Sequence, residues 1–131
     1  MTMTRNMLIG AALAAVTLAP ATAFADAHSE VVNAETHAGL AAGSADVAGV
    51  HAHLQHALNC LAGPGGNGFD AKAMNPCANA GKGAIPDTTD AAKKAALESA
   101  AAKLRDGLAA NDVAGAKKAA TDADAMLKKD E

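Results

Sequence analysis

The chain has 131 residues, half of them hydrophobic, and a formal net charge of −3 at pH 7 with histidine neutral. A chain of this length holds one small domain, and its acidic balance argues against nucleic acid as a partner. Tryptophan and tyrosine are absent and phenylalanine occurs twice, which removes the stacking surfaces that bases use. Much of the apolar content is alanine, which favours helices but buries little surface, so we expect close helices around a thin core.

Residues 1–25 have the pattern of a secretory signal peptide. Arg5 precedes an apolar run, and Ala23 and Ala25 place small residues at the third-last and last positions, as signal peptidase requires. The run is too short to span a bilayer stably. We therefore expect it to be removed, leaving a periplasmic or secreted domain of residues 26–131 with no membrane span.

Two cysteines, Cys60 and Cys77, lie 17 positions apart in this domain. In an exported protein a disulfide is the expected state of such a pair, and closing this loop adds about 3 kcal/mol of stability. The alternative is a pair of free thiols that act as soft ligands for Cu(I).

Apolar residues recur with helical period in four segments. In the first, Val31, Ala34, Glu35 and Ala38 fall near one stripe, and in the second Leu54, Leu58 and Leu61 share a face. The expected helices span residues 29–42, 46–62, 89–109 and 112–128. Glycine and proline are too frequent between the second and third segments for a regular helix, so residues 63–88 are predicted to form a crossover.

The two predicted hairpins are similar in sequence. GLAA at 39–42 followed by DVAG at 46–49 recurs as GLAA at 107–110 followed by DVAG at 112–115. Such a repeat predicts that each helical hairpin buries its apolar stripe against the other. We expect an all-α fold, a four-helix bundle of two helical hairpins, 29–62 and 89–128, joined by the long crossover that the disulfide closes.

The five histidines lie within the first hairpin or just before it: His28, His37, His51, His53 and His56. On the second helix, His53, His56 and Cys60 fall within about 60° of one another and away from the leucine stripe, which predicts an outward-facing row. His51 is nearer the buried stripe, and we expect it to meet His37 across the hairpin. Imidazole is a common ligand for zinc, copper and nickel; the alternative is a solvated helix face with incidental histidines.

A second candidate site lies at the mature N-terminus that cleavage after Ala25 would create. The amine of Asp26, the amides of Ala27 and His28 and the His28 imidazole offer four nitrogens that can lie in one plane, a geometry that suits Cu(II) or Ni(II). Asp26-Ala27-His28 resembles the amino-terminal copper- and nickel-binding motif of serum albumins. The alternative is a frayed terminus that happens to chelate.

The first hairpin also resembles a known family. Glu35-Thr36-His37-Ala38, a glycine-containing turn, and residues 46–61 with their histidines are similar to the repeats of small periplasmic metal-binding proteins. That resemblance implies exported helical hairpins packed as a four-helix bundle that bind copper, nickel and zinc through histidine. Histidines are few in this chain, so we expect one or two ions.

The leading hypothesis is an exported bundle that binds or buffers a divalent transition metal, Cu(II) or Ni(II) ahead of Zn(II), with no organic cofactor. No catalytic triad or phosphate loop is recognisable, so we expect no enzymatic activity. The competing hypothesis is an envelope interaction or stress module that binds a protein, or a second copy of the chain, through the bundle and crossover. It requires an exposed apolar patch around Phe69, Met74 and Ile85.

Overall fold

The computed structural model describes residues 26–131, and within this range it contains five helices and no strand. The expectation of an all-α fold is therefore confirmed. The predicted signal peptide and its cleavage position lie outside the described residues.

Four long helices account for most of the described chain: α1 (Ala27–Gly43), α2 (Val47–Ala62), α4 (Ala91–Ala109) and α5 (Val113–Leu127). Each begins and ends within two residues of the predicted bounds. A fifth, short helix that the sequence did not predict, α3 (Ala84–Asp87), lies in the crossover.

An aspartate caps the N-terminus of each long helix by accepting a hydrogen bond from a backbone N–H of the first turn. The caps of α2 and α5 are equivalent, because Asp46 accepts from Gly49 and Asp112 from Gly115, both at 2.7 Å. Asp26 and Asp90 cap α1 and α4 in the same way. Such caps satisfy backbone donors that a helix leaves free and are worth about 1 kcal/mol each.

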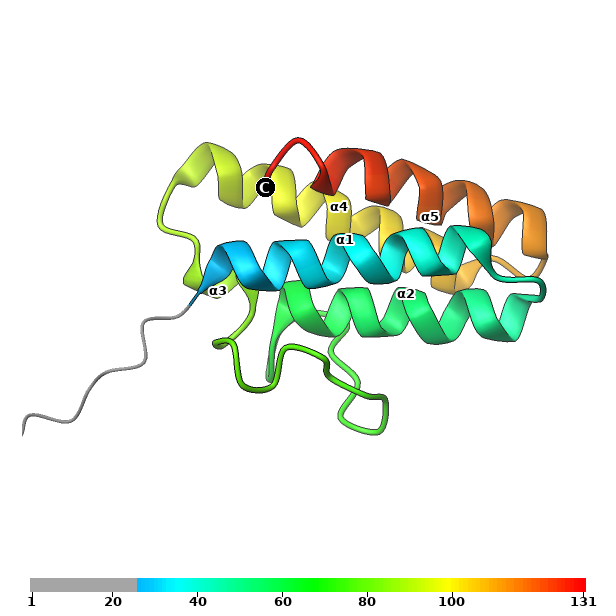
Figure 1. Ribbon diagram of the computed structural model, residues 1–131, viewed down its shortest axis with the longest axis horizontal. Helices are drawn as coiled ribbons and strands as arrows, with labels where there is room; N and C mark the ends of the chain where they lie inside the picture. Colours follow the sequence, from blue (N-terminus) through cyan, green and yellow to red (C-terminus); the bar gives the residue numbers. More distant parts are fainter. Residues whose placement is uncertain (1–25) are drawn as a thin grey trace, which may run out of the picture.

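The helices pack as two antiparallel pairs, α1 with α2 and α4 with α5, and the pairs meet through α1 against α5 and α2 against α4 (Figure 1). The two short turns lie at the same end of the molecule, and the crossover lies at the opposite end (Figure 1). The first hairpin thus stands side by side with the second, as the sequence repeat implies.

The core between the pairs is thin. Its largest apolar side chains are six fully buried leucines and two valines, surrounded by buried alanines. The helices approach closely where Gly107 faces α2, since a Cβ at Gly107 would lie 2.6 Å from Cδ1 of Leu54. Small residues thus let the helix backbones approach closely. This close packing compensates for the small apolar area that each alanine buries.

The predicted stripe of α1 is wrong at one position. Glu35 is not in the core; its side chain is 19% exposed and pairs at 3.5 Å with Lys128, the C-cap residue of α5. Glu30, one turn and one residue earlier, is fully buried in its place.

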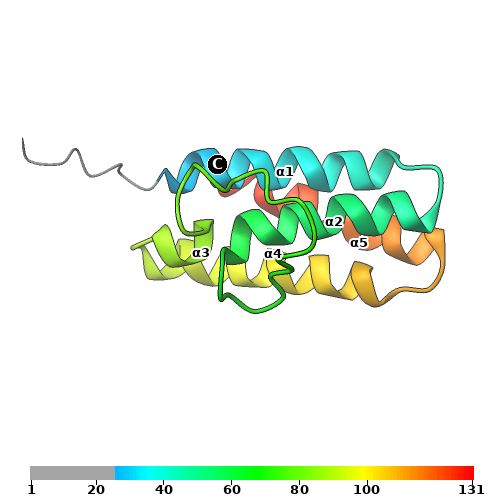
Figure 2. The same cartoon turned by 90° about the horizontal axis from the view of Figure 1, so that it is seen from below.

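The crossover runs over the outer side of α2 (Figure 2). The first residue of the crossover, Gly63, contacts the backbone of Lys82, just before α3. A Cβ at Gly63, whose φ is +66°, would overlap the carbonyl oxygen of Lys82. Glycine is needed here for both the left-handed conformation and the close approach.

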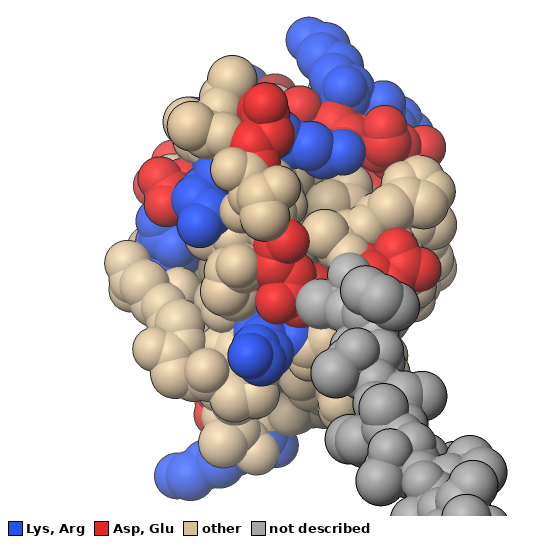
Figure 3. All heavy atoms as spheres, turned by 90° about the vertical axis from the view of Figure 1, so that its left-hand side faces the viewer, with Lys and Arg blue, Asp and Glu red and all other residues tan. Residues whose placement is uncertain are grey.

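At the end of the molecule where α1 begins, acidic and basic side chains are interspersed (Figure 3). None of the described helices is long and apolar enough to cross a membrane.

Candidate metal centre

Three histidines of the first hairpin come together between α1 and α2. His37 of α1 and His53 of α2 lie opposite each other, with their Nδ1 atoms 3.2 Å apart. Both are eight residues from Ala45 in the turn, and antiparallel helices place residues at equal distances from a tight turn side by side. This register is the sequence signal that could have identified the pair.

His56 completes the group from the next turn of α2. Its ring stands edge-on to both neighbours, with ring centroids 5.1 Å from His37 and 5.7 Å from His53. One ring nitrogen from each of the three residues lies within 4.8 Å of the others. We call His37, His53 and His56 the histidine cluster.

The environment of His37 and His56 favours neutral imidazole. All three side chains are half-buried, and burial lowers the pKa of His37 and of His56, an effect that the neighbouring histidines reinforce. Nδ1 of His56 is buried and has no hydrogen-bond partner in the structure. Neutral imidazole is the form that binds metals, and a buried nitrogen without a partner is costly unless something binds it.

His51 does not belong to the histidine cluster, so the expected contact between His51 and His37 is wrong. Its Nε2 lies 3.0 Å from the carbonyl oxygen of Ala110 in the turn between α4 and α5, the distance of a hydrogen bond. His51 is two positions before His53 on α2, and this offset turns it towards the second hairpin. The residue therefore links the two hairpins.

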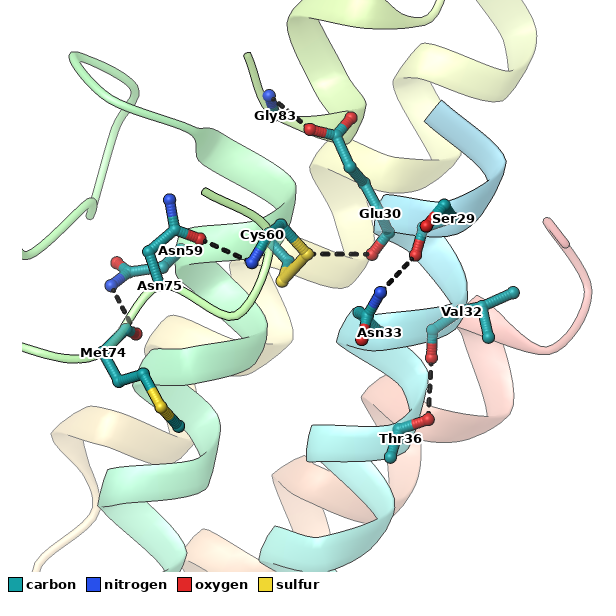
Figure 4. The surroundings of a disulfide bond; sticks show 11 residues. Ser29, Glu30, Val32, Asn33, Thr36, Asn59, Cys60, Met74, Asn75 and Gly83 are labelled. Carbon is teal, nitrogen blue, oxygen red and sulfur yellow. Dashed lines mark hydrogen bonds between the residues drawn. A yellow bond between two sulfur atoms is a disulfide. The ribbon is translucent and has the colours of Figure 1, made fainter. Parts of the chain in front are cut away.

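Cys60 forms a disulfide with Cys77, with Cα atoms 5.1 Å apart. Neither cysteine is available as a free-thiol ligand. Cys60 is also fully buried, so the expectation of an outward-facing row of His53, His56 and Cys60 is wrong at its last member. The row faces α1 and the crossover, because His53 lies against His37 and Cys60 is bonded to Cys77. The sulfur of Cys77 lies 3.9 Å from the carbonyl oxygen of Glu30, and Figure 4 shows the surroundings of the disulfide.

A buried asparagine next to the disulfide holds the crossover on α2. The side-chain amide of Asn59 donates to the carbonyl oxygens of Asp70 and Met74 at 3.0 and 3.1 Å and accepts from the N–H of Asp70 at 2.9 Å. Asn59 is fully buried. These bonds fix the backbone of the crossover one helical turn from His56.

The residues of the predicted terminal site are in the first turn of α1. Asp26 accepts from the N–H of Ser29 at 3.1 Å, and its own N–H donates to the carbonyl oxygen of Ala80 at 3.2 Å. Ala27 and His28 begin the helix, and His28 is exposed. A planar chelate would require this first turn to open, and the terminal site stays a prediction.

Glu30 is the ionisable residue that sequence reasoning missed. Its Oε1 accepts from the N–H of Gly83 at 2.9 Å, and its Oε2 is buried with no partner. Desolvation raises the pKa of Glu30 to about 7, and the carboxylates of Asp87 and Asp26 add to the rise. No local pattern marks this position, because its burial depends on the crossover returning over α1.

The apolar patch required by the competing hypothesis is incomplete. Phe69 and Ile85 are partly buried against the core, whereas Met74 is 57% exposed. Ile85 also lines a cavity of about 570 Å³ with Pro64, Glu98 and Arg105. A continuous exposed surface of the three side chains is therefore not present.

No protein-family model, curated protein or solved structure matches this chain. The resemblance to small periplasmic metal-binding proteins rests on the residues of the first hairpin alone.

Proposed function

We propose that the protein binds a transition-metal ion at the histidine cluster. The observation that carries the proposal is the convergence of three ring nitrogens, from two helices, within 4.8 Å of one another. Three imidazoles at this separation match the ligand type of zinc, copper and nickel sites and leave further coordination positions open. This centre takes the place of the broader set of four histidines expected from the sequence, because His51 is directed to Ala110.

The local structure supports a preorganised centre. His37 and His53 face each other because of the hairpin register, and the carboxylate caps of α1 and α2 fix the two helix starts. The pKa of His37 and of His56 is lowered, so little proton loss accompanies metal binding near neutral pH. An ion that ligates Nδ1 of His56 would also satisfy that buried nitrogen.

The proposal includes the finer features inferred from the sequence. The pairing of the long helices supports a four-helix bundle of two hairpins, and the disulfide supports an oxidising compartment such as the periplasm or the medium. The protein then acts as a non-enzymatic metal binder or buffer. The chelate at Asp26, Ala27 and His28 remains a second candidate site for Cu(II) or Ni(II), dependent on cleavage after Ala25.

The test is a calorimetric titration of the processed chain with Zn(II), Ni(II) and Cu(II), after its N-terminal mass is determined. His37→Ala should lower the affinity at the cluster at least about 100-fold, since it removes one of three ligands. His51→Ala is the matched control, because it removes a histidine of the same hairpin that lies outside the cluster. Equal losses in the two variants, or no binding by the parent chain, would contradict the proposal.

The terminal site is tested separately with His28→Ala. This variant should lose one equivalent of Cu(II) with square-planar nitrogen coordination and keep the equivalent held at the cluster. Unchanged Cu(II) stoichiometry in His28→Ala would eliminate the terminal site and leave the cluster in place.

A further inference from the structure

We infer that Met74 is a fourth ligand of the same centre and that its thioether makes the centre select Cu(I). The inference rests on the proposed function, since it adds a ligand to the histidine cluster. It concerns a side chain that the fold does not use, on a segment whose backbone the fold holds firmly.

The position of Met74 is fixed through Asn59. The carbonyl oxygen of Met74 accepts from the Asn59 side chain at 3.1 Å, and Asn59 follows His56 by three residues on α2. Residues three apart on a helix are neighbours, with Cβ atoms about 5–6 Å apart. The side chain of Met74 extends from this anchor along α2 and away from Cys60 (Figure 4). That direction leads to the turns of α2 that carry His56 and His53.

The side chain itself is exposed and lies outside the core. Met74 is 57% exposed, whereas Phe69 and Ile85, the other large apolar side chains of the crossover, pack against the core. Methionine has three rotatable bonds and no branch, so its sulfur can adopt several positions around a fixed backbone. A fixed backbone with an exposed, unbranched thioether suits a ligand that closes on an ion after it binds.

The chemistry of the ligand set points to copper in its reduced state. Thioether sulfur is a soft ligand that favours Cu(I), while imidazole accepts both Cu(I) and the divalent ions. The histidine cluster contains no carboxylate, so its ligands carry no negative charge. A half-buried neutral site penalises a divalent ion more than a monovalent one, because the uncompensated charge is larger.

The experiment compares metal affinities of the oxidised, processed chain and two methionine variants. Cu(I) is supplied anaerobically as an acetonitrile complex, without thiol reductants that would break the disulfide, and competes with a chromophoric Cu(I) chelator. Met74→Leu keeps the size of the side chain and removes the sulfur. Met126→Leu is the matched control, because it removes the methionine of α5, a helix without histidine.

We expect Met74→Leu to lower Cu(I) affinity roughly tenfold or more, with Zn(II) affinity unchanged within about twofold. Met126→Leu should match the parent chain for both ions. Copper X-ray absorption should show a sulfur scatterer in the parent chain and in Met126→Leu, lost in Met74→Leu. The proposed terminal chelate should not contribute to the Cu(I) measurement, since its planar nitrogen geometry suits Cu(II).

Two results would overturn the inference. Equal Cu(I) affinities of Met74→Leu and the parent chain, with His37→Ala still impaired, would leave the metal centre intact without Met74 as a ligand. A parallel loss of Zn(II) and Cu(I) affinity in Met74→Leu would show that the substitution acts on the fold. Absence of all binding by the parent chain would instead remove the proposed function itself.

Discussion

The Nδ1 atoms of His37 and His53 face each other at 3.2 Å across the α1–α2 interface. A hydrogen bond at this distance needs the Nδ1–H of one ring and the bare Nδ1 of the other, so its direction depends on the tautomers. An ion bound at both Nδ1 atoms would require both neutral rings to carry their proton on Nε2, and His56 stands beside the pair with a third ring. Protonation of an imidazole would therefore compete with the proposed ion for the same ring nitrogen.

Metal affinity should depend on pH in a way that follows from this competition. Burial lowers the pKa of His37 and of His56 below 6.5, so both imidazoles stay neutral at pH 7 and are protonated only at more acidic pH. We expect a Zn(II) affinity that is nearly constant between about pH 7 and 8 and falls as the pH drops below the ordinary imidazole pKa of about 6.5. Titrations from pH 5 to 8 measure this, and a constant affinity throughout would contradict it.

Glu30 should make folding stability fall as pH rises. Its pKa is raised from 4.5 to about 7 in the folded chain, so the stabilising proton is fully bound below pH 4.5 and is lost through pH 7. Glu30→Gln cannot ionise and keeps an oxygen for the N–H of Gly83. Relative to the parent chain, it should gain up to roughly 3 kcal/mol between pH 4.5 and 8.

Urea unfolding of the variant and the parent chain at pH 4.5 and pH 8 measures the gain in free energy of unfolding. The histidines are the same in both chains, so their contribution cancels in the difference. Glu35→Gln is the control, because it removes a carboxylate of the same helix that pairs with Lys128 at the surface. A pH-independent difference between Glu30→Gln and the parent chain would rule out the proton uptake.

Loss of the disulfide should lower stability by about 3 kcal/mol, the value for a loop of this length. The loop spans 17 positions between Cys60 and Cys77. The double variant Cys60→Ala, Cys77→Ala tests this by urea unfolding without reductant. We expect the helices to remain, since the variant keeps all six core leucines. Equal unfolding midpoints for variant and parent would contradict the estimate.

The close approach of α4 to α2 should not tolerate a methyl group. A Cβ at Gly107 would lie 2.6 Å from Leu54 Cδ1 and 3.1 Å from the Cβ of Ala119, so Gly107→Ala should destabilise the chain by about 1–3 kcal/mol. Gly43→Ala is the matched control at the end of α1, where nothing lies within 4 Å of the added Cβ. Thermal unfolding should show a loss for the first variant only.

Local signals in the sequence were sufficient to predict the helices. Apolar periodicity, two short turns and the capping aspartates are properties of neighbouring residues, so the four long helices appear within two residues of the expected bounds. The repeat of 39–49 in 107–115 likewise predicts two matching hairpins. The short α3 was not predicted, because its four residues follow a glycine-rich segment and are too few to show a helical repeat of apolar residues.

The errors concern contacts between elements. The position of His51 near the hydrophobic face of its helix predicts that it meets His37. The register of the hairpin about Ala45 instead brings His37 to His53. Glu30 was not considered for the core because its burial requires Gly83, 53 residues away in sequence. A helical projection puts Cys60 on the exposed side of α2. It cannot show that the crossover covers this side, because Cys77 belongs to a segment outside the helix.

The two ends of the molecule are held together differently. At one end the disulfide, the bond between Glu30 and Gly83 and the contact between Gly63 and Lys82 clamp the helices. Towards the other end, the hydrogen bond of His51 in α2 with Ala110 joins the first hairpin to the turn of the second. Local opening should therefore begin at the turns, where amide protons exchange fastest with solvent. An ion bound by His37 and His53 would extend the slowly exchanging part of the protein towards that end.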